Sequence, residues 1–184
     1  MKQLTFNKTQ GEKVTCPRTR GFTLVETVIY IAFVAILSVL ATEATMIMMR
    51  SFYTLRLTNN INQSATVALE RMSREIRNSY DIDATESTLG ANPGRLTLKT
   101  IDSVGSNTTI EFYISGGQIR IKEGGGDKGS LMTKNATVTN LVFRQIATIN
   151  SKAIKIELTL RDVYGAIQKD SNFYNTIVLR GSAH

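Results

Sequence analysis

The sequence predicts an α+β protein in which one long N-terminal helix packs on an antiparallel β-sheet domain. No glycine or proline, the usual helix breakers, interrupts residues 22–89. After Pro93, apolar and polar residues alternate with a period of two, as they do in half-buried strands. A chain of 184 residues suits about one globular unit.

Residues 1–21 form a basic segment before the helix. Five basic residues against one acidic residue give this segment a net charge of +4, which leaves +3 for the rest of the chain. The high isoelectric point is therefore weak evidence for nucleic-acid binding, because it largely reports a segment of the kind that stays on the cytoplasmic side of a membrane. The segment has no apolar core before Gly21, so it does not look like a secretory signal peptide.

The first part of the helix has the composition of a membrane span. Residues 22–42 are predominantly apolar, and Glu26 is the one charged residue among them. At 1.5 Å rise per residue, about 20 residues cover about 30 Å of hydrocarbon. We therefore expect a transmembrane span at about 22–42. The excess of lysine and arginine before it predicts a cytoplasmic N-terminus and an extracytoplasmic C-terminal domain.

Beyond Arg50 the helix becomes amphipathic, so one face should pack against a domain. Glu70 and Arg74 stand four residues apart in the order that favours an ion pair. Turn-forming residues after position 77 predict that the helix, taken as 22–80, ends near 78–80. The apolar residues of the predicted buried face recur at three- and four-residue spacing: Ile61, Ala65, Ala68, Leu69, Met72 and Ile76.

The remaining segment, residues 81–184, is predicted to be a β-rich globular domain. The pair Gly116-Gly117 predicts a tight hairpin, because glycine tolerates the positive φ that such turns demand. Short turns and clean alternation favour antiparallel pairing with one buried face, covered by the amphipathic half of the helix. The predicted strands lie at 96–98, 110–114, 119–121, 138–146, 154–160 and 174–180.

Residue types that most enzymes use are scarce. Cys16 is the one cysteine and His184 the one histidine, and both stand outside the segments predicted to fold as helix and strands. A disulfide framework, a multi-histidine metal site and histidine-dependent acid–base chemistry are therefore not expected. We predict a protein that is not an enzyme and that needs no cofactor or metal.

The glycine-rich stretch 124–130 suggests a phosphate or calcium site at first sight. A phosphate-binding loop of the Walker type needs Gly-Lys followed by Ser or Thr at the start of a helix, whereas Lys128 precedes Gly129 and the flanks resemble strands. One carboxylate, Asp127, supplies too few oxygen ligands for calcium. We predict a mobile connection between strands.

Basic residues of the β-domain raise the alternative of a DNA-binding surface. Acidic residues interrupt them, and the aromatic residues needed to stack single-stranded bases are not interleaved with them. We expect a solvated strand face and no nucleic-acid partner. The five residues are Lys152, Lys155, Arg161, Lys169 and Arg180.

Glu26 has the strongest claim to a functional role. A carboxylate inside a membrane span costs about 2.5–3.5 kcal/mol, so it needs a partner or a purpose. The plain alternative is that its side chain reaches back to the near interface, since it lies one helical turn from the start of the helix.

The stretch Gly21-Phe22-Thr23-Leu24-Val25-Glu26 resembles the N-terminal signal of type IV pilins and type II secretion pseudopilins. The resemblance implies that a prepilin peptidase cuts between Gly21 and Phe22 and that Phe22 becomes the N-methylated terminus. It also implies that Glu26 contacts a neighbouring subunit during assembly. A neighbour's terminal amine within several Å would neutralise that carboxylate in a low dielectric.

Residues 68–77 are similar to the helix segment after the membrane span in minor pilins and J-type minor pseudopilins. The chain departs from many major pilins because it has no C-terminal cysteine pair. The resemblance implies a minor filament subunit, held first in the inner membrane by one span and then in an extracytoplasmic pilus or pseudopilus. Its implied partners are prepilin peptidase, other subunits, and an inner-membrane assembly platform with its ATPase.

Two readings of the role stay open at this point. The alternative to a filament subunit is a membrane-anchored extracytoplasmic binding module, including one that binds DNA in an uptake pilus. The type of machine, whether pilus, secretion or competence system, and a tip or shaft position also stay open.

Overall fold

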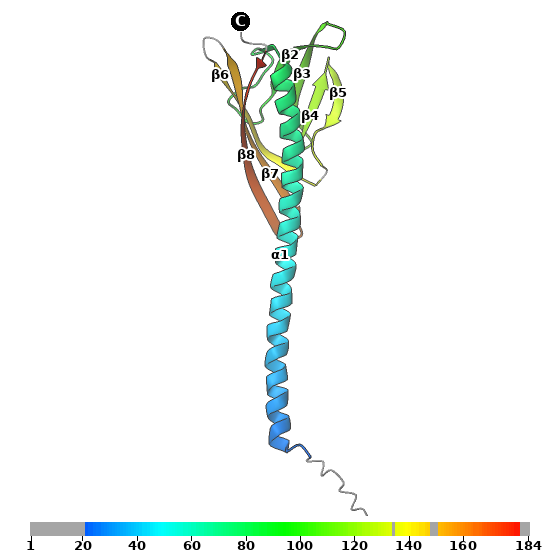
Figure 1. The fold of residues 1–184 in the computed structure, drawn as a ribbon, viewed down its shortest axis with the longest axis vertical. Helices are drawn as coiled ribbons and strands as arrows, with labels where there is room; N and C mark the ends of the chain where they lie inside the picture. The colour runs from blue at the N-terminus through cyan, green and yellow to red at the C-terminus, as the bar shows by residue number, and fades with distance from the viewer. Residues whose placement is uncertain (1–20, 134, 148–150, 181–184) are drawn as a thin grey trace, which may run out of the picture. The chain divides into compact units, whose positions relative to one another are not determined.

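A computed structural model of the chain describes residues 21–133, 135–147 and 151–180. The basic residues of the predicted leader, Cys16 and His184 lie outside the described residues. One long helix is followed by antiparallel strands, so the predicted α+β fold with a helix on a sheet is confirmed (Figure 1). The chain divides into two units after Met46.

Helix α1 runs from Leu24 to Asn78 and is 55 residues long. Its end agrees with the prediction and is fixed by local hydrogen bonds. Ser79 donates its backbone N–H to the Glu75 carbonyl at 3.0 Å, and its buried hydroxyl donates to the Ile76 carbonyl at 2.7 Å. These bonds satisfy carbonyls that the last turn leaves without a helical donor.

The part of α1 that belongs to the second unit buries one stripe of residues. The stripe includes five of the six predicted residues, and the sixth, Leu69, is half-buried at its margin. Two residues of the stripe, Ala65 and Ala68, are small and almost fully buried. The buried residues are Leu57, Ile61, Ser64, Ala65, Ala68, Met72 and Ile76.

The predicted ion pair between Glu70 and Arg74 is not present among the described residues, and that prediction is wrong. The arginine three positions earlier makes the contacts instead: Arg71 pairs with Glu75 at 2.9 Å and with Glu123 at 2.5 Å. The physical reason is that an exposed pair on a helix is worth only about 0.3–0.5 kcal/mol, too little to hold two long side chains together.

The strands form two antiparallel sheets in the described residues. One has the order β1-β2-β3-β4-β5 and the other the order β6-β7-β8. Alternation in the sequence predicts antiparallel pairing but does not predict this division, because it indicates which face of a strand is buried and not which strand is its neighbour. The strands are β1 (Asp81–Ile82), β2 (Leu96–Ile101), β3 (Asn107–Ser115), β4 (Gln118–Glu123), β5 (Gly126–Ser130), β6 (Thr137–Ala147), β7 (Lys152–Tyr164) and β8 (Ile167–Val178).

The predicted hairpin turn between β3 and β4 is confirmed. Gly116 and Gly117 both have positive φ, at 61° and 72°. The prediction of a mobile connection over 124–130 is wrong, because residues 126–130 form β5, which pairs with β4. Glycine is depleted in strands, so the glycine-rich sequence of β5 gave no indication of a strand. The strand forms through its pairing with β4.

Backbone hydrogen bonds join the two sheets. Val138 of β6 donates to Gly117 at the β3–β4 turn at 2.8 Å, and Gly94, which follows the loop before β2, donates to Leu141 of β6 at 2.8 Å. Gly90 donates to Phe143 of β6, also at 2.8 Å. Both sheets therefore enclose one core.

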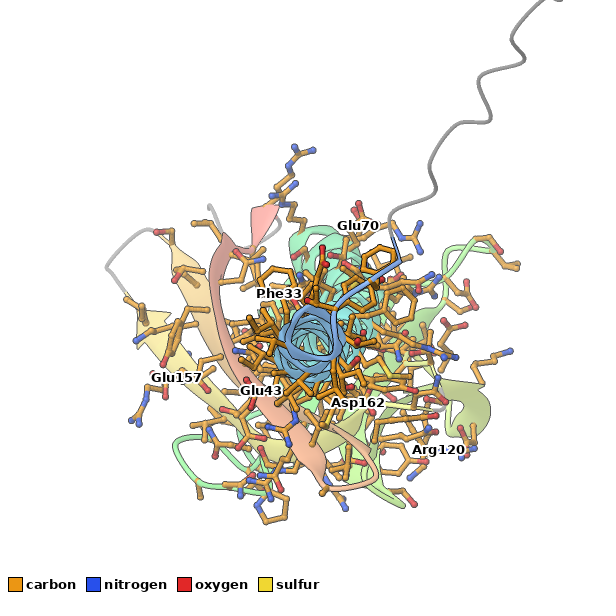
Figure 2. All side chains as sticks on the ribbon, turned by 90° about the horizontal axis from the view of Figure 1, so that it is seen from below. Phe33, Glu43, Glu70, Arg120, Glu157 and Asp162 are labelled. Atoms are coloured by element: carbon orange, nitrogen blue, oxygen red, sulfur yellow. The ribbon has the colours of Figure 1, made fainter. Side chains whose placement is uncertain are left out.

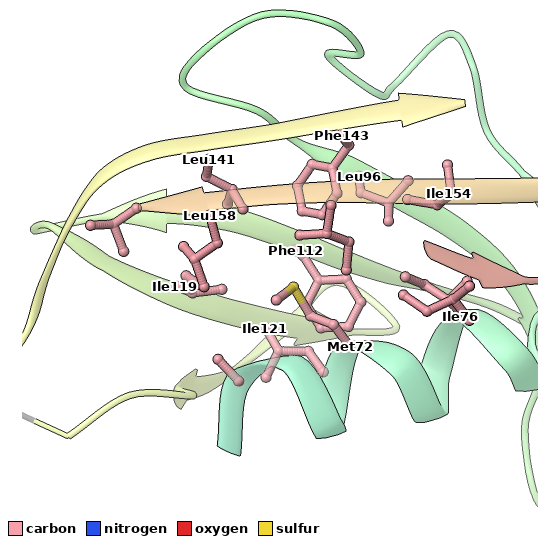
Figure 3. Close-up of a cluster of buried hydrophobic side chains, with 14 of the residues drawn as sticks. Met72, Ile76, Leu96, Phe112, Ile119, Ile121, Leu141, Phe143, Ile154 and Leu158 are labelled. Atoms are coloured by element: carbon pink, nitrogen blue, oxygen red, sulfur yellow. The ribbon is translucent and has the colours of Figure 1, made fainter. Parts of the chain in front are cut away.

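The core lies between α1 and the two sheets. Figure 3 shows Met72 and Ile76 of the helix facing side chains that come from both sheets. Each such side chain contributes about 1.5–3 kcal/mol when it leaves water, so this part of the helix is integral to the domain. The largest fully buried side chains are Phe112, Phe143, Ile61, Met72, Ile76, Leu96, Leu98, Ile119, Leu141, Ile154, Ile156 and Leu158.

Candidate functional site

The predicted cleavage residues precede the first turn of α1. Gly21 and Phe22 have no regular secondary structure, and Phe22 is 80% exposed. A Cβ added at Gly21 would meet no atom of the described chain within 4 Å. The described residues therefore leave space for a side chain at this position.

Thr23 is the N-cap residue of α1, a role that the resemblance does not assign. Its hydroxyl accepts the backbone N–H of Glu26 at 3.3 Å. Its carbonyl accepts the N–H and the hydroxyl of Thr27 at 3.1 and 2.9 Å. Thr-x-x-Glu is the capping-box pattern, so the sequence did contain the signal that identifies this cap.

Glu26 lies in the first turn of α1, where its negative charge faces the positive end of the helix dipole. This position gives the carboxylate a modest structural role. Within residues 21–133, 135–147 and 151–180, no cation makes an ion pair with it. The described residues therefore do not supply the positive charge that the predicted assembly contact requires.

The hydroxyl groups of the apolar segment are satisfied inside the helix. Ser38, Thr42 and Thr45 each donate to the carbonyl four residues earlier, at 2.8, 2.9 and 2.8 Å. A helix in lipid needs such internal partners, because hydrocarbon offers no hydrogen bonds. Figure 2 looks along the helix and shows Phe33 and Glu43 projecting outward from its axis.

The same segment is long and apolar enough to span a membrane. Its most apolar window has a mean hydropathy of 2.4, and none of that window is buried. The side chains are exposed from Phe22 through the whole first unit. So large an apolar surface needs lipid or other apolar helices around it.

Asp127, weighed above as a calcium ligand, has protein partners. Its Oδ2 accepts from Arg120 Nη2 at 2.6 Å and from Arg120 Nε at 3.0 Å, and its Oδ1 accepts from Gly129 N at 2.8 Å. The guanidinium holds the pKa of Asp127 below its usual range, and the carboxylate raises the pKa of Arg120. Asp127 therefore joins β4 to β5 as a structural residue.

Three of the five basic residues considered for DNA binding are neutralised by carboxylates. Lys152 pairs with Asp81, Lys155 with Glu157, and Arg161 with Asp170. Lys169 lies on β8 among polar residues, and Arg180 lies just after β8. The five residues do not form an uninterrupted basic surface.

A groove of about 580 Å³ lies between the C-terminal part of α1 and β8. Arg74 and Arg77 line it from the helix, and Arg180 lines it from the end of β8. Asn175 of β8 donates to the hydroxyl of Ser73 at 3.0 Å, which bridges the two walls. The three arginines share the lining of the groove with the carboxylate of Glu70.

Comparison of the chain with protein-family models, curated proteins and solved structures finds no match. The fold and the geometry themselves define the class: an α+β protein with an N-terminal apolar helix long enough to cross a membrane once.

Proposed function

We propose that the protein is a minor pilin or pseudopilin, a structural subunit of a filament of the type IV pilus or type II secretion kind. The observation that carries the proposal is an unburied apolar helix that begins directly after Gly21-Phe22 and has Glu26 in its first turn. Lipid covers such a helix before assembly, and the helices of neighbouring subunits replace lipid in the filament.

The surroundings of Gly21 support processing by a prepilin peptidase. The peptide bond between Gly21 and Phe22 lies before the helix begins, and the fold has no steric need for glycine there. A glycine that the fold does not need for steric reasons is consistent with a residue that a processing enzyme recognises. Cleavage makes Phe22 the N-terminal residue of the mature chain, and the peptidase then methylates its new terminal amine.

The electrostatics of Glu26 support a role in assembly. Its carboxylate has no ion-pair partner in the described chain and lies in an apolar segment. A buried charge without a partner is strongly unfavourable. The terminal amine of a neighbouring subunit supplies the opposite charge, which aligns one subunit against the next.

The remaining partners follow from this proposal. An inner-membrane assembly platform, driven by its ATPase, moves the subunit from the bilayer into the filament. The β-domain is extracytoplasmic, because the basic segment before the helix stays in the cytoplasm. Within the second unit, the β-domain should move together with the C-terminal part of α1, because Met72 and Ile76 of the helix are part of the domain's hydrophobic core.

The test is to express the chain with and without prepilin peptidase and to determine its N-terminus by mass spectrometry. The expected product begins with N-methylated Phe22. Gly21→Val should block cleavage without unfolding the chain, because the added side chain has open space. An intact Met1 terminus, or a cut at another bond, contradicts the proposal.

The groove lined by Arg74, Arg77 and Arg180 favours a second candidate, a membrane-anchored extracytoplasmic binding module. Its arginines suit a carboxylate or phosphate group. This candidate predicts an unprocessed N-terminus together with ligand binding that Arg77→Gln weakens. A processed terminus and filament incorporation that survive Arg77→Gln support the filament subunit instead.

A further inference from the structure

Two tyrosines join the tip of the β7–β8 hairpin to helix α1. The ring of Tyr53 stacks on the ring of Tyr164, with centroids 4.7 Å apart and planes 21° apart. Tyr164 pairs with Ile167 across the hairpin, and Gly165 has a φ of 59° in the turn. The hairpin tip therefore lies against α1 at Tyr53, and all of these residues belong to the second unit.

A pocket of about 280 Å³ lies beside this stack. The two stacked tyrosines line it, together with polar side chains from the helix, from β7 and from the segment before β6, and with the apolar side chains of Leu57 and Val163. The lining residues that matter here are Tyr53, Arg56, Asn60, Asn135, Asp162 and Tyr164.

Asp162 is a buried charged residue in the lining of this pocket, and it is only 5% exposed. Its Oδ2 accepts from Asn60 Nδ2 at 3.0 Å, and its Oδ1 accepts from the backbone N–H of Val163 at 2.8 Å. A carboxylate has about four acceptor sites, so these two bonds leave capacity for a further donor. Among the described residues no cation forms an ion pair with Asp162, although Arg56 lines the same pocket.

In the sequence, the helix residues that line the pocket follow directly after the apolar run of α1. Ile47, Met48 and Met49 are the last apolar residues of the run, and each is more than half exposed. Residues 22–49 span about 42 Å at 1.5 Å per residue, which matches the full thickness of a bilayer with its headgroups, about 40–45 Å. Tyr53 and Arg56 follow within about 10 Å of that point along the helix axis.

The chemistry around the pocket is that of a membrane surface. Val163 and Tyr164 at the hairpin tip are 54% and 49% exposed. Tyrosines with one apolar and one wet end are enriched at membrane interfaces. Arg50 and Arg56 on the helix can reach lipid phosphates, whereas Asp162 suits a positively charged group.

We propose that this pocket binds the headgroup of an aminophospholipid of the phosphoethanolamine class at the outer surface of the membrane. The primary ammonium donates to the carboxylate of Asp162, Arg56 binds the phosphate, and the Tyr53–Tyr164 stack packs against the linker between them. The inference rests on the membrane span of the proposed function and on neither cleavage nor filament assembly.

The chemistry of the pocket distinguishes among lipids. A quaternary ammonium has no N–H to donate to Asp162, so phosphatidylcholine should bind poorly. Phosphatidylglycerol has no cation and leaves the buried carboxylate without a counter-charge. The contact should therefore depend on the headgroup and not on the presence of a bilayer alone.

The test uses the full, uncleaved chain in nanodiscs of phosphatidylcholine, alone or mixed with phosphatidylethanolamine or with phosphatidylglycerol. Amide hydrogen exchange of residues 162–168 reports the hairpin tip, and native mass spectrometry reports which lipid remains bound. Phosphatidylethanolamine should slow exchange and remain bound selectively. Losing one charge-assisted hydrogen bond corresponds to about a tenfold loss of binding, so Asp162→Asn should weaken the selectivity for phosphatidylethanolamine about tenfold. Arg56→Gln should weaken the retention of phosphatidylethanolamine by about the same factor, because it removes the contact with the phosphate.

Matched controls lie outside the pocket. Asp170→Asn changes another carboxylate of the β7–β8 hairpin, and Arg144→Gln changes an exposed arginine of β6, so both should leave the selectivity unchanged. If Asp162→Asn unfolds the chain, the retention of phosphatidylethanolamine by Arg56→Gln decides the outcome, because Arg56 is exposed and its replacement should not unfold the chain.

Two results overturn the proposal. One is equal exchange of residues 162–168 in all three lipid compositions. The other is protection that appears only when a nanodisc holds two copies of the chain, which would assign the pocket to a protein partner. Neither result depends on N-terminal processing, so a failure here is distinguishable from a failure of the proposed filament role.

Discussion

The guanidinium of Arg71 lies 2.9 Å from Glu75 Oε1 and 2.5 Å from Glu123 Oε1. One side chain of α1 thereby joins its own next turn to strand β4 of the five-stranded sheet. The side chains of Arg71 and Glu123 are each 34% exposed, and that of Glu75 is 12% exposed. This partial burial makes the contact stronger than an ordinary surface pair.

Replacing Arg71 should destabilise the domain. Arg71→Met keeps much of the apolar length of the side chain and removes the hydrogen bond to Glu123 and the ion pair with Glu75, at a cost of about 1–2 kcal/mol. Thermal unfolding of the full chain in detergent, followed by circular dichroism, measures this loss. Arg74→Met is the control: its side chain is 61% exposed and its contact with Glu75 is 3.5 Å, so its effect should be small. Equal effects of the two changes would contradict a bridging role for Arg71.

The complete burial of Ala68 in the core, where it is 0% exposed, predicts an overpacking effect at this position. Ala68→Leu should cost about 1–3 kcal/mol, because a well-packed core must shift to admit the added atoms. Val67→Leu changes the neighbouring residue, which is 49% exposed, and should have little effect. Chemical denaturation of both variants compares them directly, and tolerance of leucine at position 68 would indicate a loose interface.

Gly94 marks a close approach between the loop before β2 and strand β6. A Cβ at this position would lie 2.7 Å from the Leu141 carbonyl oxygen and 3.1 Å from the Phe143 ring. Gly94→Ala should therefore cost about 1–3 kcal/mol, because a backbone carbonyl cannot move aside as a flexible side chain does. Gly126→Ala serves as the control, since its nearest atom would be 3.5 Å away. A similar loss of unfolding free energy in both would refute the steric explanation.

The ion pairs of the domain predict how its stability depends on pH. Hydrogen bonds from partners lower the pKa of several carboxyl groups below the ordinary values of 3.8 for aspartate and 4.5 for glutamate. The folded chain then binds fewer protons than the unfolded chain in this range, so stability is present above the ordinary pKa values and is lost as the pH falls through the folded values. The groups are Asp81, Asp83, Asp127, Glu157 and Asp170.

Unfolding temperatures measured between about pH 6 and about pH 2 should fall toward the acid end. Lys152→Met tests one pair, because Lys152 is the largest cause of the lowered pKa of Asp81. The variant should be less stable than the parent chain near neutral pH, and the difference should shrink as Asp81 becomes protonated in both. A difference that stays constant with pH would assign the effect of Lys152 to packing and not to charge.

Glu26 and Thr23 allow the assembly role to be separated from helix capping. Glu26→Gln keeps the size of the side chain and removes its charge, so membrane insertion and processing should persist while incorporation into filaments falls. Thr23→Val removes the hydroxyl that caps the helix, at a cost of about 1 kcal/mol, and should leave incorporation largely intact. Immunoblots of sheared filaments and of membranes measure both. Normal incorporation of Glu26→Gln would refute the pairing role.

Much of the fold could be predicted because its signals are local. The absence of glycine and proline predicts α1, and the three- and four-residue spacing of its apolar residues predicts the buried face from Ile61 to Ile76. The Gly116-Gly117 turn was equally accessible, because a two-residue hairpin requires positive φ at both positions. These features depend on residues near one another in the chain.

Strand ends were harder to predict. β8 begins at Ile167, well before the predicted start at position 174, because its first half is polar and gains its structure by pairing with β7. β5 has no apolar alternation at all, and the pairing with β4 and the ion pair between Asp127 and Arg120 hold it in the sheet. A strand that forms mainly because it pairs with a neighbouring strand has little pattern in its own sequence that predicts it.

The candidate functional residues differ in the same way in how far a local pattern can indicate them. Gly21, Phe22 and Glu26 lie close together in the chain, so a linear motif could suggest them. The pocket beside Tyr53 could not be identified in this way. Its hydrogen bond between Asn60 and Asp162 joins residues 102 positions apart, and nothing in either segment indicates that the two meet.

The sequence by itself determined the helix, its division into an apolar and an amphipathic part, the antiparallel character of the strands, and the position of the motif at Gly21. These properties follow from composition and period, which any short window of the chain displays. Only the tertiary structure decided that the strands form two sheets, that Arg71 bridges to Glu123 across 52 positions, and that Tyr164 packs on Tyr53. Such contacts arise because packing brings together distant segments whose local patterns are compatible with many partners.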